Sequence, residues 1–295
     1  MATTSLQKQI AQNHRNTKLI ILVFILMMAA IGGIFAWLNS DPKMVLYFVA
    51  VSALYAGIQY FLADKLAIKS AGAVEIQPSD NPRLYNIVAS LASEAKIPMP
   101  KVYIVNDAAP NAFATGRDPA HACVAATTGI LEIMDDKELR AVMAHEMSHV
   151  KNYDIRVTMI VFGLVSLAGL LSDFGMRVMF YGGGRDDEDN SPIGILIAGA
   201  VLILSPIIAT LIQLGVSRQR EYLADASSVD LTHSPDDMIA ALRKLDSHAQ
   251  PMHQQNLAAE SLYISNPLRK SMFSTLFSTH PSIESRIERL ENAKK

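Results

Sequence analysis

Cysteine is nearly absent from this sequence: Cys123 is the only one, so no disulfide can form within the chain. A single unpaired thiol fits a reducing compartment. A metal site in this chain would have to be built from histidine and carboxylate side chains.

Charge is also scarce. Charged residues make up 18% of the chain, whereas a soluble domain carries about a quarter. The formal net charge of -2 gives no chain-wide attraction to nucleic acid, and we expect no nucleic-acid partner. Hydrophobic residues make up 50% of the chain, and the mean hydropathy is +0.21. This composition predicts that a lipid bilayer surrounds part of the protein.

Two uncharged apolar runs near the N-terminus, Leu19–Leu38 and Met44–Ala63, are each long enough to cross a hydrocarbon core of about 30 Å. The turn-forming segment Asn39–Pro42 joins them. A cleaved signal peptide is disfavoured, because the first run is too long and a second run follows at once. The sequence therefore predicts a transmembrane hairpin.

A second hairpin is predicted over residues 157–216. Ile193–Val216 is another long uncharged run, and the shorter apolar run Val157–Ser172 precedes it. We expect this hairpin to cross the membrane, which gives about four transmembrane helices. The alternative is a buried or interfacial hairpin that does not cross.

Lysine and arginine flank the runs on one side, and this bias predicts that both termini and the polar segments are cytoplasmic. The residues that carry the bias are Lys8, Arg15, Lys18, Lys65, Lys69, Arg218 and Arg220. The chain thus divides into an N-terminal segment with a hairpin (1–63), a first polar part (64–156), the second hairpin (157–216) and a second polar part (217–295).

The polar segments combine helices with a few short strands, so the expected fold class is α+β, mainly helical, with a small sheet. Asn81 and Pro82 open a helix that ends at Pro98. The pattern predicts a strand at 102–105 and a hairpin that pairs 112–115 with 123–128. Asp135 and Glu138 form a capping box at the start of a further helix.

That last helix carries the sequence HEMSH at His145–His149. His145 and His149 lie four residues apart and share one helix face, so both imidazoles can reach one zinc ion. Glu146 is placed to act as a general base. The pattern HExxH arises by chance in on the order of one chain in a hundred of this size, so a third ligand is needed to support it.

Glu221 is the candidate third ligand, and Asp225, four residues later, is placed to contact a ligand histidine. The alternative is a solvated helix face with charge pairs. Asp154 could support a ligand imidazole, cap the next helix or lie at the lipid interface. His280 and Arg286 could stabilise an oxyanion, although spacing alone favours a turn histidine and a surface arginine.

The order of these parts resembles the HtpX-type membrane metalloproteases, a bacterial heat-shock protease family related to the CAAX prenyl proteases. The resemblance covers nearly the whole chain and includes both hairpins, HEMSH, the sequence EYLAD at Glu221–Asp225 and the histidine-proline pair before the last helix. It implies a zincin-like (gluzincin) catalytic domain with one Zn²⁺ per chain, Glu221 as its third ligand, and His280 and Arg286 as aids to the transition state.

The resemblance also implies that an edge strand binds the substrate backbone, because related gluzincin proteases bind substrates by strand addition. The equivalent residues here are Asn111, Ala112, Phe113 and Ala114. A plain structural strand is an equal alternative for this segment.

We therefore expect a zinc-dependent endopeptidase of the bacterial cell membrane that cleaves misfolded or damaged membrane and cytoplasmic proteins in stress. Its partners would be unfolded polypeptides and the lipid bilayer. The rival readings are a non-proteolytic membrane scaffold, which the intact Glu146 disfavours, and a transporter with a vestigial metal site. Asp173 and Arg177 are the only charges that could line a transport path.

Overall fold

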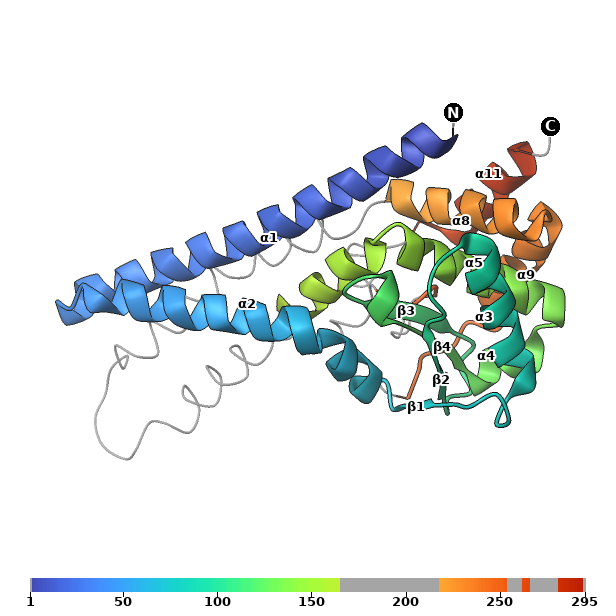
Figure 1. The fold of residues 1–295 in the computed structure, drawn as a ribbon, viewed down its shortest axis with the longest axis horizontal. Helices are drawn as coiled ribbons and strands as arrows, with labels where there is room; N and C mark the ends of the chain where they lie inside the picture. Colours follow the sequence, from blue (N-terminus) through green and yellow to red (C-terminus); the bar gives the residue numbers. More distant parts are fainter. Residues whose placement is uncertain (1, 165–217, 254–261, 266–280, 294–295) are drawn as a thin grey trace, which may run out of the picture.

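Two long helices, α1 (Ala2–Asn39) and α2 (Lys43–Ser70), form a hairpin that projects from the part of the described structure that contains the sheet (Figure 1). The computed structural model describes residues 2–164, 218–253, 262–265 and 281–293. The hairpin turns at Ser40, whose φ of 53° lies in the left-handed region. The predicted turn between the first two apolar runs is therefore confirmed.

Both helices of this hairpin contain a segment that is long and apolar enough to cross a membrane, Ile10–Ile34 in α1 and Lys43–Leu62 in α2. Many large apolar side chains on them are exposed, as expected of a lipid-facing surface: Leu19, Leu22, Leu26, Trp37, Leu46, Val51, Leu54 and Phe61. At 38 residues, α1 is about 57 Å long and exceeds a hydrocarbon core of about 30 Å. Part of α1 therefore extends beyond the apolar layer.

The first turns of the predicted second hairpin are described as a helix over residues 154–164. This helix packs on α1 through an apolar cluster that includes Ile20, Phe24, Val157 and Val161. The hydroxyl of Tyr55 in α2 also donates a hydrogen bond to the carbonyl of Gly163 at 2.8 Å. The rest of the predicted hairpin, including Asp173, Arg177 and the Ile193–Val216 run, lies outside the described residues, so a count of four transmembrane helices stays a prediction.

The sheet has four strands in the order β1-β2-β4-β3: β1 (Ala73–Glu75), β2 (Lys101–Val105), β4 (Ala122–Thr127) and β3 (Ala112–Gly116). β2 and β4 are parallel, and the other neighbours are antiparallel. The predicted β3–β4 hairpin is confirmed, with a short 3-10 helix, η1 (Pro119–His121), in its connection. Gly116 ends β3 at a φ of 138°, a conformation that favours glycine.

Capping side chains begin the helices of the body as the sequence predicts. Asn81 accepts a hydrogen bond from the Leu84 amide at 3.0 Å at the start of α3 (Pro82–Ala95). α3 ends at Ala95, because the next residue, Lys96, is in the left-handed region, and this end lies slightly before the predicted end at Pro98. Asp135 and Glu138 form the predicted capping box of α5 (Asp136–Lys151). The other described helices are α4 (Thr128–Ile133), α8 (Arg218–Thr232), α9 (Pro235–Ser247) and α11 (Ile283–Asn292).

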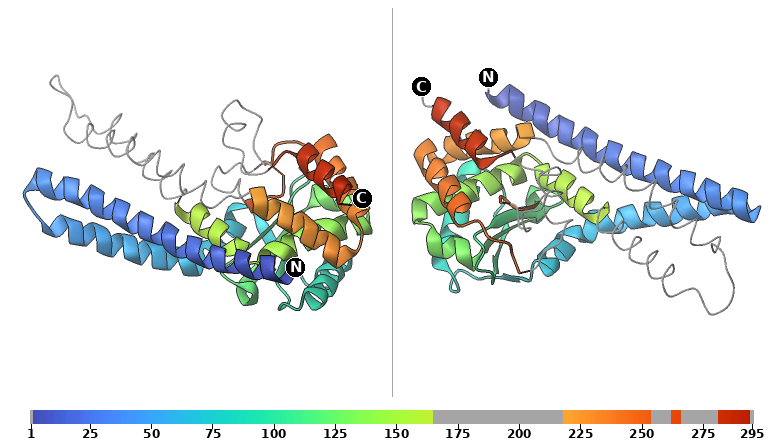
Figure 2. Two further views of the ribbon diagram at one scale, coloured as in Figure 1. Left: turned by 90° about the horizontal axis from the view of Figure 1, so that it is seen from above. Right: turned by 180° about the vertical axis from the view of Figure 1, so that it is seen from behind.

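α5 lies at the centre of the body, with α3, α8, α9 and the sheet packed around it. Its residues Leu139, Val142, Met143 and Met147 are fully buried in the main apolar cluster. Figure 2 shows the C-terminal helices, in orange and red, grouped on the body, while the α1–α2 hairpin extends away from it. The described polar segments before residue 165 and after residue 217 pack together, and the mainly helical α+β class is confirmed.

Candidate metal centre

The HEMSH segment forms one turn of the central helix α5, and this turn brings the two histidines together. The Nε2 atoms of His145 and His149 lie 3.2 Å apart. Their rings are nearly perpendicular, at 85°. Both nitrogens therefore point toward one position in space, as the four-residue spacing predicts.

Glu221 reaches the same position from α8. Its carboxylate oxygens lie 3.6 Å from His145 Nε2 and 3.7 Å from His149 Nε2. α8 is held against α5 by the Ser228 hydroxyl, which donates to the Ala141 carbonyl at 2.7 Å, and by the fully buried Ala224. Donor atoms of His145, His149 and Glu221 all lie within 4.8 Å of one another.

These separations fit a small divalent cation. For zinc, with ligand bonds of about 2.1 Å, tetrahedral geometry places ligand atoms about 3.4 Å apart. The two Nε2 atoms are 3.2 Å apart, and each lies 3.6 or 3.7 Å from a different oxygen of Glu221, so the three side chains are close enough to share one such ion. Two imidazoles and one carboxylate are also a donor set that zinc prefers, and they leave room for a further ligand.

Asp225 contacts the far side of the His145 ring. Its Oδ1 lies 2.9 Å from His145 Nδ1. Because a carboxylate can only accept, this contact places the proton on Nδ1 and leaves the Nε2 lone pair for a metal. Asp225 therefore sets the tautomer of His145.

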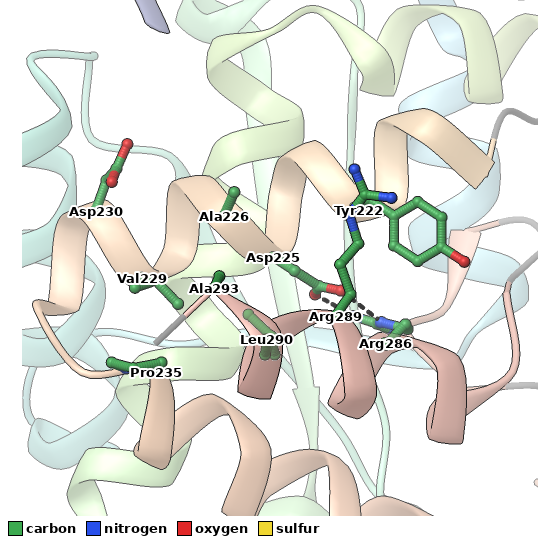
Figure 3. Close-up of a pocket in the computed structure, with 10 residues that line it drawn as sticks. All are labelled: Tyr222, Asp225, Ala226, Val229, Asp230, Pro235, Arg286, Arg289, Leu290 and Ala293. Atoms are coloured by element: carbon green, nitrogen blue, oxygen red, sulfur yellow. Dashed lines mark hydrogen bonds and ion pairs between the residues drawn. The ribbon is translucent and has the colours of Figure 1, made fainter. Parts of the chain in front are cut away.

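Arg286, from α11, neutralises the Asp225 carboxylate. Its Nε and Nη2 donate to the two Asp225 oxygens at 2.9 and 2.6 Å (Figure 3). Burial raises the pKa of Asp225, but the charge of Arg286 and hydrogen bonds from His145 and Arg286 lower it to about 2. Arg286 is 1% exposed, so the reading of it as a surface arginine, favoured by spacing alone, is wrong.

The prediction from spacing failed because Arg286 lies at the edge of the apolar stripe of α11. This stripe packs onto α8 and α9. A cavity of about 270 Å³ lies beside this pair, lined by α8, α11 and Pro235 (Figure 3). Asp225 and Arg286 form part of its wall, whereas His145 and His149 do not line it. Asp225 thus contacts both this cavity and the ring of His145.

Asp154 contacts the other histidine. Its Oδ2 lies 3.0 Å from His149 Nδ1, and its side chain is 4% exposed. The chain reaches this position through a sharp turn after α5, where Tyr153 has a φ of 60°. Asp154 was predicted to support a ligand imidazole, to cap the next helix or to lie at the lipid interface. In the structure it contacts the His149 imidazole and stands at the start of the 154–164 helix.

The electrostatics of the cluster favour positive charge. Burial lowers the pKa of His145, but the hydrogen bond to Asp225 and the nearby carboxylate of Glu221 outweigh this and raise it to about 9. Burial also lowers the pKa of His149, and the Glu221 charge and the Asp154 hydrogen bond together raise it. In the absence of a metal, the two imidazoles would therefore tend to be protonated. A metal ion that binds them must displace these protons.

Glu146 follows His145 on α5 and is 2% exposed. Its charge, with those of Asp225 and Glu221, raises the pKa of Arg286 against the lowering effect of burial. It therefore belongs to the same buried charge cluster. His280, the other residue assigned to the transition state, lies outside the described residues.

The segment Asn111–Ala114 lies at the edge of the sheet, as expected, but that edge is partly occupied. The Ile264 amide donates to the Ala112 carbonyl at 3.0 Å. The Asn111 side-chain amide donates to the Ser265 carbonyl at 2.8 Å. Phe113 forms a bridge with Tyr263, and their rings meet edge to face at 5.0 Å. No local pattern in the sequence marks residues 263–265 as neighbours of this strand, because their pairing is long-range.

The sequence of this chain is similar to those of known peptidases. Residues 78–294 match peptidase family M48. The chain is 50% identical to a "Protease HtpX homolog" of Tropheryma whipplei (strain Twist), over 96% of both chains. It is 45% identical to a "Protease HtpX homolog" of Streptococcus uberis, over 97% of this chain and 99% of the relative.

A solved structure shares the fold. The crystal structure of S. mikatae Ste24p aligns with 97% of this chain at a TM-score of 0.53 and 16% identity. The chain spans 64% of the length of that larger structure. At this identity the similarity concerns the arrangement of the elements alone.

Proposed function

The chain belongs to peptidase family M48, and on this premise we propose that it is a zinc-dependent endopeptidase with His145, His149 and Glu221 as its metal ligands. The family and its relatives confirm the resemblance to HtpX-type proteases and make this chain a membrane metalloprotease. The observation that carries the zinc proposal is the convergence of three donor atoms from α5 and α8 within 4.8 Å.

Zn²⁺ bound by these residues would polarise the scissile carbonyl and make a water molecule more acidic. Glu146 would accept a proton from the attacking water and then donate it to the nitrogen of the leaving amine. Its buried position on α5 beside His145 supports this role. Burial among charged neighbours also keeps bulk water away from the proton transfer.

Asp225 and Asp154 would orient the two imidazoles by accepting their Nδ1 protons, since each lies about one hydrogen bond away, at 2.9 and 3.0 Å. We assign Arg286 to the support of Asp225, because its Nε and Nη2 groups are both used there. A transition-state role for Arg286 and His280, implied by the resemblance, stays a prediction.

For the substrate, we propose an extended polypeptide that pairs with the outer edge of β3 at Asn111–Ala114. Backbone pairing is independent of sequence and suits unfolded membrane proteins. Such a strand would compete with Ile264 and Ser265, which already contact the Ala112 carbonyl and the Asn111 side chain. We place the enzyme in the bacterial cell membrane with its catalytic part and both termini in the cytoplasm.

The full chain in detergent tests this function. We expect purified protein to hold one zinc per chain, detected by anomalous scattering, and to degrade casein until o-phenanthroline removes the metal. Glu146→Gln should keep the zinc and lose about 10²- to 10⁴-fold of the activity. Glu221→Gln should lose both.

The matched control is Glu132→Gln, the same chemical change at an exposed residue of α4. It should retain parental zinc content and activity. Parental activity in the Glu146→Gln variant would overturn the assignment of the base. A zinc signal remote from Glu221 would overturn the ligand set.

A further inference from the structure

We propose that Asn13, in the N-terminal helix α1, is a positioning residue for the metal centre, which it reaches through Asp154 and His149. This proposal rests on the proposed function of that centre. Helix α1, which contains a candidate membrane span, would then contribute to the metal centre as well as anchor the protein.

Asn13 is 1% exposed and inserts its side-chain amide between two acceptors. Its Nδ2 donates to Asp154 Oδ1 at 2.6 Å and to the Asn152 carbonyl at 2.9 Å. Both partners can only accept, so the orientation of the Asn13 amide is determined by its surroundings. The other Asp154 oxygen, Oδ2, lies 3.0 Å from His149 Nδ1.

These contacts secure the turn that brings Asp154 to His149. The turn runs from Asn152 through Tyr153, whose φ of 60° is unusual for a bulky residue. Asn13 contacts the chain on both sides of Tyr153 and so spans the turn. The nearby Arg220 Nη1 lies 3.8 Å from Asp154 Oδ1, an ion-pair distance that is too long for a direct hydrogen bond.

The next residue of α1 strengthens the same interface. The His14 ring lies 5.0 Å from the Tyr153 ring, and its Nδ1 lies 3.0 Å from Arg156 Nη1. The apolar segment Ile10–Ile34 belongs to this same helix. A hydrogen-bonded path of two side chains, Asn13 and Asp154, therefore connects a candidate membrane helix to a metal ligand.

The physical consequence is an effect on metal affinity. A carboxylate that accepts two short hydrogen bonds is held in one orientation, and it holds the imidazole with its Nε2 toward the metal. Loss of such an outer partner weakens metal binding by about 10- to 100-fold. If Asn13 only packed α1 against the body, its substitution would change the stability of the protein and leave its metal affinity unchanged.

The test is a double-mutant cycle on the full chain in detergent, with zinc affinity measured by competition against a fluorescent chelator. Asn13→Leu keeps the approximate volume and removes the hydrogen bonds. We expect zinc affinity to fall by up to about 10-fold, the lower end for loss of a direct partner of a ligand histidine, because Asn13 acts through Asp154. In an Asp154→Ala background, the same Asn13 change should have no further effect, because its route to His149 is already lost.

Thr17→Val is the matched control. Thr17 lies one turn further along the same helix and is 7% exposed, and its hydroxyl has no hydrogen-bond partner among the described residues. This variant should bind zinc like the parent. Asn13→Ala replaces Asn13→Leu if leucine prevents folding.

Parental zinc affinity in a folded Asn13 variant would overturn the proposal, as would an equal loss with and without Asp154. These outcomes are distinct from failure of the proposed function. In that case the parent itself would not bind zinc, or His149→Ala would bind zinc as tightly as the parent.

Discussion

Replacing Arg286 with alanine would remove the cation that neutralises the Asp225 carboxylate. The side chains of Arg286 and Asp225 are 1% and 3% exposed, so water cannot take over this role without rearrangement. After the substitution, the buried Asp225 carboxylate would still contact His145 Nδ1 at 2.9 Å, but it would lose both hydrogen bonds from Arg286.

Removing one partner of a buried ion pair costs about 3–5 kcal/mol of stability. For a unit of 150–250 residues, each kcal/mol lowers the melting temperature by roughly 2–4 °C. We therefore expect Arg286→Ala to melt about 6–20 °C below the parent. Exchanging both charges at once, with Asp225→Asn and Arg286→Met, should recover most of this loss because the charge of Asp225 is removed together with the arginine that neutralises it.

The single cysteine provides the assay. Cys123 lies in β4 and is 6% exposed, so a maleimide dye that fluoresces on reaction would report unfolding of the sheet in the detergent-solubilised chain. The parent, the single variant and the double variant are compared in the metal-free state. A single variant that melts with the parent, or a double variant as unstable as the single, would refute the argument that Arg286 compensates a buried charge.

Two further predictions concern the sheet and its surroundings. Gly129→Ala should destabilise the protein by about 1–3 kcal/mol, because the added Cβ would lie 2.1 Å from the Ala108 carbonyl oxygen; an unchanged melting temperature would contradict this close packing. Burial raises the pKa of Cys123 from 9.0 to about 11, so the folded thiol keeps its proton where the unfolded one loses it. Stability should therefore fall as the pH rises from about 9 to 11, and Cys123→Ala should flatten this part of the curve.

Local sequence was sufficient for the parts of the fold that depend on neighbouring residues. The Asn81 cap, the capping box of Asp135 and the strand at 102–105 all follow from side chains a few positions apart, and the structure contains them, with the strand one residue longer at its start. The long apolar runs likewise predicted the first helical hairpin. The end of α3 was placed slightly late, because Lys96 ends the helix in a left-handed conformation that proline at 98 does not require.

The metal-ligand cluster depends on local sequence only in part. The four-residue spacing of His145 and His149 determines that they share a helix face, and it does so for any protein that makes this helix. The approach of Glu221 was a hypothesis supported by resemblance, and only the packing of α8 on α5 brings its carboxylate within 3.7 Å of both imidazoles.

The sequence by itself determined the helical hairpin, the pair of histidines and the caps, because each rests on contacts within a few residues of chain. The tertiary structure alone decided that Arg286 is buried against Asp225, that Asn13 contacts Asp154, and that Ile264 meets the edge of β3. These contacts join residues far apart in the chain. Their geometry depends on how whole helices pack, and no local pattern encodes that.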